Sequence, residues 1–230
     1  MRTESSSHKS GEGVLRVRKS RNETRTYYDK ISRIYDLLAE RSEAPVRAVG
    51  LKKLGATPGE KVLEIGFGTG HCLASLAAAI GPKGGVYGID LSAGMIRTAR
   101  GVLRKKGCDD LVELICGDAM RLPFREAVMD AIFMSFALEL FDTPDIPEVL
   151  AECRRVLQPG GRIVVASMSK EGRATALVRT YEWAHRHFPN LLDCRPIFAA
   201  QALEAAGFRI VSTEMQRMWV PVEIVLATAK

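Results

Sequence analysis

Three alternating glycines mark the stretch of this chain most suited to chemistry. Gly66, Gly68 and Gly70 directly follow an apolar run, Val-Leu-Glu-Ile at 62–65. Glycine lacks a β-carbon and adopts positive φ, so a ligand can lie against the backbone where a strand turns into a helix. The spacing therefore predicts a cradle for a nucleotide-like cofactor.

Three acidic residues fall where predicted strands end. Glu64 lies in the first strand, Asp90 ends the second, and Asp118 follows the third. A carboxylate at the end of the second strand can accept hydrogen bonds from both hydroxyls of a ribose. Asp118 is placed to accept from an adenine amino group. These positions predict a ligand that contains adenosine.

A nicotinamide dinucleotide is the first alternative. Its fingerprint, Gly-x-Gly-x-x-Gly, opens a helix whose N-terminus faces a pyrophosphate. Here the third glycine, Gly70, comes one residue early, and Glu64 stands two residues before the first glycine. A ligand with a positively charged end and no phosphate fits these residues better.

The elements that must position these residues alternate between strand and helix. Predicted helices cover residues 26–38, 44–54, 71–80, 92–105, 146–157 and 201–206. Predicted strands cover residues 61–65, 85–89, 112–116, 127–135, 162–167, 208–216 and 220–229. Alternation indicates a parallel sheet with helices on both faces, and the last two strands, with no helix between them, should pair antiparallel. We expect an α/β, Rossmann-like fold: a seven-stranded, mostly parallel sheet with one antiparallel edge strand.

Composition limits the class of protein. Hydrophobic residues make up 47% of the chain, which is typical of a globular protein. No apolar run reaches the roughly 18 residues that span a membrane, and the polar N-terminus has no signal-peptide core. The five cysteines are an odd number without close pairs, which favours neither disulfides nor a zinc site. We expect a cytoplasmic protein.

Two segments stand apart from the alternating pattern. Residues 1–26 carry seven Lys or Arg and three Glu, so +4 of the net charge of +6 lies there. This predicts a disordered basic leader (1–25) before a single domain (26–230) that opens with helices at 26–55. The nearly neutral domain argues against a nucleic-acid groove, although the leader could contact an anionic membrane surface weakly. The long segment 168–197 is expected to form a substrate lid.

Four motifs in order resemble those of class I S-adenosylmethionine-dependent methyltransferases. They read Glu-Ile-Gly-Phe-Gly-Thr-Gly at 64–70, Gly-Ile-Asp-Leu-Ser-Ala-Gly-Met at 88–95, Gly-Asp-Ala-Met-Arg-Leu-Pro-Phe at 117–124 and Leu-Gln-Pro-Gly-Gly at 157–161. With the leading Tyr-Tyr-Asp-Lys-Ile-Ser at 27–32, they are most similar to the ubiquinone/menaquinone biosynthesis C-methyltransferase-like group.

The resemblance implies S-adenosylmethionine as methyl donor, without a metal. Glu64 would reach the donor ammonium directly or through water, and Asp90 would hold the ribose hydroxyls. The other implied donor-binding residues are Tyr28, Gly66, Gly68 and Gly70 at the methionine end, Ser135 beside the sulfonium, and Leu91, Met95, Asp118 and Ala119 around the adenine.

The implied reaction transfers the sulfonium methyl group to an acceptor. Because the positive sulfur already activates the methyl, the enzyme must mainly align the reactants and exclude water, and a general base is optional. Candidates for that base are Glu139, Tyr27 and His185. We expect a methyltransferase that acts on a small, apolar or amphipathic acceptor. One alternative is an RNA or protein methyltransferase that docks its substrate through the basic leader. Another is a non-catalytic cofactor-binding scaffold.

Overall fold

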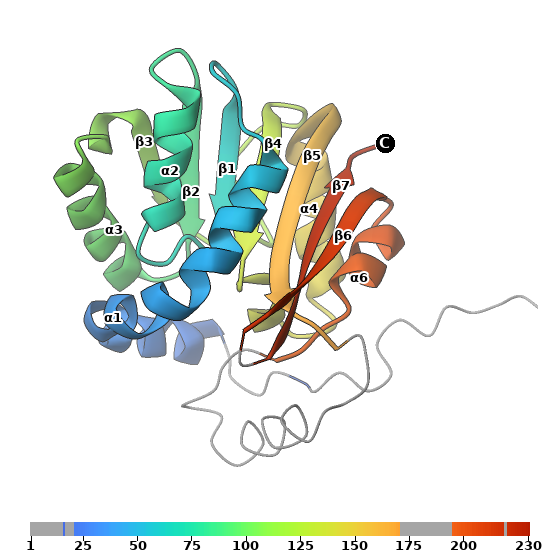
Figure 1. Cartoon of the computed structure of the whole chain (residues 1–230), viewed down its shortest axis with the longest axis horizontal. Helices are drawn as coiled ribbons and strands as arrows, with labels where there is room; N and C mark the ends of the chain where they lie inside the picture. The colour runs from blue at the N-terminus through green and yellow to red at the C-terminus, as the bar shows by residue number, and fades with distance from the viewer. Residues whose placement is uncertain (1–15, 17–20, 171–194, 219) are drawn as a thin grey trace, which may run out of the picture.

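The computed structural model describes residues 16, 21–170, 195–218 and 220–230, with residues 21 and 30–41 described by their backbone only. A sheet with helices on both faces forms the centre of the molecule (Figure 1). The strands follow the spatial order β3-β2-β1-β4-β5-β7-β6. Their bounds are β1 Lys61–Ile65, β2 Gly85–Asp90, β3 Val112–Cys116, β4 Met129–Ser135, β5 Leu157–Met168, β6 Arg209–Arg217 and β7 Pro221–Thr228.

One strand of the sheet runs against the others. Strands β1 to β5 are parallel, and β7 pairs antiparallel with both β5 and β6, so the predicted fold class is confirmed. The reversed strand lies one place in from the edge, which β6 occupies. Burial explains this order, because β7 is mostly buried whereas every second residue of β6 is exposed. A strand with one solvent-exposed face suits the edge of a sheet.

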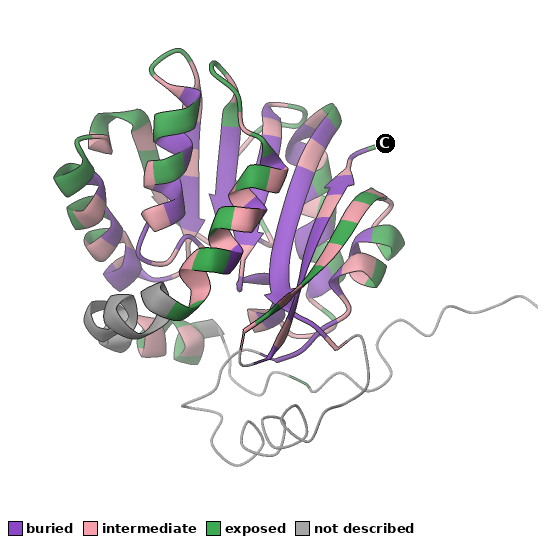
Figure 2. Ribbon diagram, viewed as in Figure 1, coloured by how far each residue is buried: buried purple, intermediate pink, exposed green. Residues whose placement is uncertain are grey.

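Helices cover both faces of the sheet. Figure 2 shows the buried strands between helices whose outer surfaces are exposed. Helices α1, α2 and α3 pack on one face through one apolar cluster, and α4 and α6 pack on the other through a second cluster. Their bounds are α1 Arg21–Leu54, α2 His71–Ile80, α3 Ala93–Lys106, α4 Ile146–Val156 and α6 Ala199–Ala205, with short 3-10 helices η1 Asp109–Leu111 and η2 Leu138–Leu140.

The first helix corrects two predictions. The sequence predicted two helices, 26–38 and 44–54, but α1 is continuous from Arg21 to Leu54 and contains Pro45. A proline inside a helix removes one backbone hydrogen bond without necessarily ending the helix. Residues 21–25 therefore belong to α1, although the sequence placed them in the basic leader.

The strand order reverses beside β1. Strand β1 pairs with β2 on one side and with β4 on the other, so the loops that follow β1 and β4 leave in different directions. In open α/β sheets, ligands bind in the crevice at the carboxyl ends of the strands at such a reversal. Among the described helices, none is long and apolar enough to cross a membrane.

Candidate functional site

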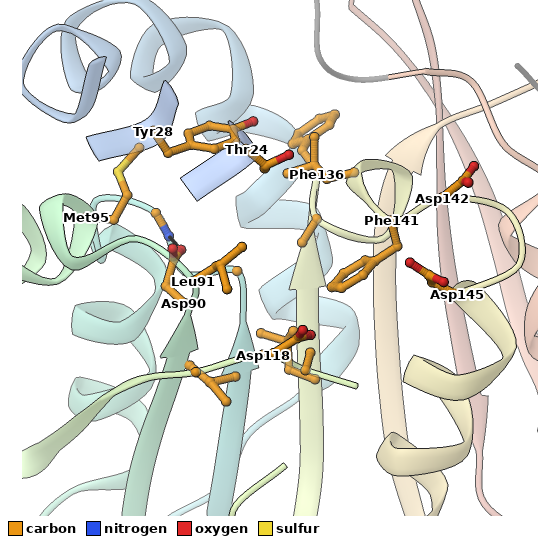
Figure 3. Close-up of a pocket in the computed structure, with 18 residues that line it drawn as sticks. Thr24, Tyr28, Asp90, Leu91, Met95, Asp118, Phe136, Phe141, Asp142 and Asp145 are labelled. Atoms are coloured by element: carbon orange, nitrogen blue, oxygen red, sulfur yellow. Dashed lines mark hydrogen bonds between the residues drawn. The ribbon is translucent and has the colours of Figure 1, made fainter. Parts of the chain in front are cut away.

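A pocket opens where the strand order reverses. It lies at the carboxyl ends of β1, β2, β3 and β4, beneath the N-terminal part of α1 (Figure 3). The pocket is concave and combines apolar side chains with a few polar groups, which is typical of a cofactor site. It is lined by eight of the eleven residues predicted to bind the donor: Tyr28, Gly66, Gly68, Asp90, Leu91, Met95, Asp118 and Ala119.

The glycine loop, residues 66–70, forms the floor of this pocket. Gly66 and Gly70 have positive φ values of 69° and 84°. A β-carbon at Gly66 would lie 2.6 Å from the Ala137 β-carbon, and one at Gly70 would lie 2.8 Å from the Ala99 β-carbon. A β-carbon at Gly68 would meet no atom within 4 Å. Gly68 therefore leaves open space at the pocket, whereas Gly70, which is not a lining residue, lets α2 and α3 pack closely.

Asp90 joins the glycine loop to the start of α3. Its Oδ2 accepts from the Gly68 backbone N–H at 3.0 Å, and its Oδ1 accepts from the Ser92 N–H at 2.9 Å. Burial raises the Asp90 pKa to about 6, although these backbone bonds favour the charged form. The carboxylate is thus fixed at the pocket wall with acceptor oxygens available to a diol.

Glu64 lies behind the glycine loop and does not line the pocket. It is 3% exposed, and its Oε2 has no hydrogen-bond partner among the described residues. Burial raises the Glu64 pKa to about 8, a shift that Arg47 on α1 partly offsets. A buried carboxyl oxygen without a partner is costly, so a donor or a cation brought near it would be stabilising.

Strands β2 and β3 supply the wall opposite β4. Asp118 lies in the turn after β3, where its Oδ1 accepts from the Met120 N–H at 3.0 Å. Ala119 follows it, and Leu91 and the buried Met95 contribute apolar surface from the loop after β2 and from α3. An acceptor oxygen between apolar side chains suits a flat, partly polar ring such as adenine.

The N-terminal part of α1 forms the roof. Thr24 and Tyr28 line the pocket from this helix (Figure 3). Tyr27, a predicted base, is not a lining residue, and its ring packs edge-to-face on Tyr28 with centroids 5.4 Å apart. The structure therefore places Tyr28 at the pocket and Tyr27 beside it.

The loop after β4 enters the pocket through Phe136. Phe136 lines the pocket with φ of 52°, a backbone conformation that costs a non-glycine residue of order 1 kcal/mol. The predicted Ser135 lies beneath it, and its buried Oγ has no hydrogen-bond partner within the described part of the chain. Ser135 is not among the residues that line the pocket.

The predicted base Glu139 is sealed inside the protein. It lies in η2 with 0% exposure, and its Oε1 accepts from the Met168 N–H at 3.1 Å. Burial raises the Glu139 pKa to about 8. Glu139 is not a lining residue, so this arrangement ties η2 to the end of β5. His185 and most of the predicted lid, 171–194, lie outside the described residues.

Two acidic residues at the pocket were not predicted. Asp142 and Asp145 line it between η2 and α4. Arg16 forms a bidentate ion pair with Asp142, with N–O distances of 2.7 to 3.0 Å. The sequence could not place these acids, because their approach to the pocket depends on the turn that η2 makes after β4.

Comparisons with known proteins agree with this geometry. Residues 62–161 match the family described as a methyltransferase domain, and all four sequence motifs fall inside that segment. A demethylmenaquinone methyltransferase from Lactococcus lactis subsp. lactis is 33% identical over 154 residues, which is 67% of this chain and 59% of the relative. The match thus spans less than two thirds of that relative.

Solved structures share the fold. A SAM dependent methyltransferase from Aquifex aeolicus is 25% identical, with a TM-score of 0.65 over 88% of this chain and 98% of that one. The cyclase SpnF superposes with a TM-score of 0.76 over 94% of this chain and 98% of its own, but at 18% identity it supports the fold alone. Residues 62–161 of this chain therefore match a methyltransferase domain, and the fold around them is shared with a solved SAM dependent methyltransferase.

Proposed function

We propose that this protein is a methyltransferase that takes its methyl group from S-adenosylmethionine bound in the pocket. The observation that carries the proposal is the convergence of the glycine loop, Asp90 and Asp118 on one cavity. Asp90 would accept from the ribose hydroxyls, Asp118 and the Ala119 amide would meet the adenine edge, and Tyr28 would cover the methionine end.

The pocket residues fit such a donor. The space beside Gly68 admits a ligand against the backbone, and the apolar surfaces of Leu91 and Met95 suit a base. Glu64 offers an unsatisfied, buried carboxyl oxygen behind the loop that would hold the methionine part. An ammonium group in that region would supply a hydrogen-bond donor to this oxygen and would stabilise the ionised carboxylate.

The proposed reaction is a displacement at carbon. When bound, the donor supplies a methyl group on a positive sulfur, so a bond from the acceptor forms as the sulfur–carbon bond breaks and a neutral thioether leaves. The chain's part is to bind both reactants, align them about 3 Å apart and exclude water. Among the described base candidates, Tyr27 lies next to the roof residue Tyr28, whereas Glu139 serves the fold through Met168.

Donor binding is expected to release a proton through Glu64. At pH 7 this carboxyl is mostly protonated because its pKa is raised to about 8, and a nearby ammonium would lower that pKa. Titration calorimetry with S-adenosylhomocysteine in phosphate and in Tris at pH 7 measures the proton count. We expect a release approaching one proton for the wild type and close to none for Glu64→Gln. Equal counts in the two proteins would remove Glu64 from this role.

The acceptor is proposed to be a small molecule with an apolar or amphipathic body. Phe136, Leu140 and Phe141 give the β4 side of the pocket an apolar surface. Because the Lactococcus relative is named a demethylmenaquinone methyltransferase, a quinol ring is the acceptor that we would test first.

A panel of acceptors tests this proposal. Purified protein is incubated with methyl-labelled donor and with short-chain demethylmenaquinols, simple phenols, amines or thiols. We expect labelled product from the quinol or phenol, and less from hydrophilic amines. Preferred transfer to a charged amine would overturn the acceptor class, and donor binding without transfer to any class would favour the non-catalytic alternative.

A further inference from the structure

Asp29 joins the roof helix α1 to the beginning of α3. Its Oδ1 accepts from the Ser92 hydroxyl and from the Gly94 backbone N–H, both at 2.7 Å. Asp29 follows the pocket residue Tyr28 directly, so this contact lies next to the roof itself. One carboxyl oxygen thus connects α1 to the start of α3 through residues that are more than sixty positions apart in sequence.

The carboxylate occupies the N-terminus of α3, where backbone N–H groups lack partners within the helix. Ser92 caps the helix in the usual way, since its Oγ accepts from the Met95 N–H at 3.1 Å. Asp29 adds a second cap from another element, and its negative charge is favourable at this end of a helix dipole. The Ser92 and Gly94 bonds hold the Asp29 pKa below its ordinary value.

The two backbones also touch. A β-carbon at Gly94 would lie 2.8 Å from the Asp29 Cα and 3.0 Å from its carbonyl oxygen. Backbone atoms cannot swing aside as a flexible side chain can, so only glycine lets α1 lie this close to α3.

The same contact continues into the donor pocket. Ser92 donates its backbone N–H to Asp90 Oδ1, and Asp90 Oδ2 accepts from the Gly68 N–H. A continuous series of hydrogen bonds therefore runs from the glycine loop through Asp90 and Ser92 to Asp29. Three walls of the pocket, namely floor, side and roof, are fixed relative to one another by this series.

We propose that Asp29 is a positioning residue for donor binding: it holds the N-terminal part of α1 over the pocket, so that Tyr28 and Thr24 cover the donor bound to Asp90. This role rests on the proposed function, because the roof matters only if the pocket holds the donor. Asp29 itself does not touch the ligand.

Binding of S-adenosylhomocysteine to the full chain tests the role. Asp29→Ala removes two charge-assisted hydrogen bonds and is expected to raise the dissociation constant about tenfold. Asp29→Asn keeps an acceptor oxygen and should stay within about threefold of the wild type. Gly94→Ala, which forces the helices apart without altering a polar group, should weaken binding like Asp29→Ala. Asp110→Ala, an exposed acid in η1 just beyond the other end of α3, is the matched control and should bind as the wild type does.

Hydrogen exchange distinguishes positioning from general instability. Bound S-adenosylhomocysteine should slow hydrogen exchange of the backbone amides of residues 22–29 in the wild type and in Asp29→Asn. This protection should be lost in Asp29→Ala. A variant that is only less stable would, when measured well below its melting temperature, keep the wild-type dissociation constant and the wild-type protection, because almost all of it is folded there. Wild-type affinity and protection in Asp29→Ala would overturn the role of Asp29 alone. Absence of binding in the wild type would instead overturn the proposed function.

Discussion

Replacing Asp90 by alanine is expected to weaken S-adenosylhomocysteine binding by about 100-fold or more. The carboxylate would accept from both ribose hydroxyls, and hydrogen bonds to a charged group contribute about 1.5–3 kcal/mol each. The change also removes the acceptor for the Gly68 N–H, which helps to fix the loop. Asp90→Asn, which keeps one acceptor oxygen, should lose about tenfold. Titration calorimetry at pH 7.5 measures both.

The ionisation of Asp90 is also expected to make donor binding depend on pH. Burial raises the Asp90 pKa to about 6 in the protein without ligand, and only the ionised carboxylate accepts from both hydroxyls. In a Glu64→Gln background, which removes the proton release expected from Glu64, affinity should be constant above pH 7 and fall as the pH drops through 6, approaching tenfold per unit. Adding Asp90→Asn to that background should abolish this fall. Equal affinity of Asp90→Ala and the wild type at pH 7.5 would contradict our placement of the ribose.

Adding one methyl group at Gly66 is expected to abolish donor binding and to destabilise the fold. Gly66 has φ of 69°, and its new β-carbon would lie 2.6 Å from the Ala137 β-carbon. The left-handed conformation costs about 1–2 kcal/mol and overpacking about 1–3 kcal/mol. For a domain of this size, the melting temperature should fall by roughly 5–15 °C, as followed by circular dichroism.

Gly101→Ala provides the control for this substitution. Gly101 lies inside α3, and a β-carbon there would meet nothing within 4 Å. Alanine is favoured over glycine in a helix interior by about 0.5–1 kcal/mol, so this variant should melt slightly higher than the wild type and bind donor normally. A Gly66→Ala protein with wild-type stability and affinity would show that the loop does not need this conformation.

The fold followed from sequence wherever the signals were local. The strands at 61–65 and 112–116 and the helix at 71–80 have the predicted bounds, because apolar periodicity, glycine and proline mark their ends directly. Two errors arose where a distant contact decides the outcome. A break was predicted between residues 38 and 44, although α1 continues through this stretch. The reversed strand was predicted at the edge of the sheet, whereas β7 lies between β5 and β6.

The site residues, too, were predictable where the signal was local and not where a tertiary contact decides. Asp90, Asp118 and the glycines occupy strand ends, so their convergence is a property of any parallel sheet of this order. Glu139 also follows a strand, but η2 turns it inward to the Met168 N–H, and the same turn brings Asp142 to the pocket. The geometry of a three-residue turn depends on its tertiary contacts, which no periodic pattern in the sequence encodes.

Transfer of label from methyl-labelled S-adenosylmethionine to a small-molecule extract tests the central claim most directly. Wild-type protein and Asp90→Ala are incubated in parallel with the same metabolite extract, and the organic phase is separated and counted. We expect labelled product with the wild type and at least a hundredfold less with Asp90→Ala at limiting donor, in line with the lost affinity. Equal transfer by the two proteins, or none by a wild type given extracts that contain quinols, phenols, amines and thiols, would contradict the account.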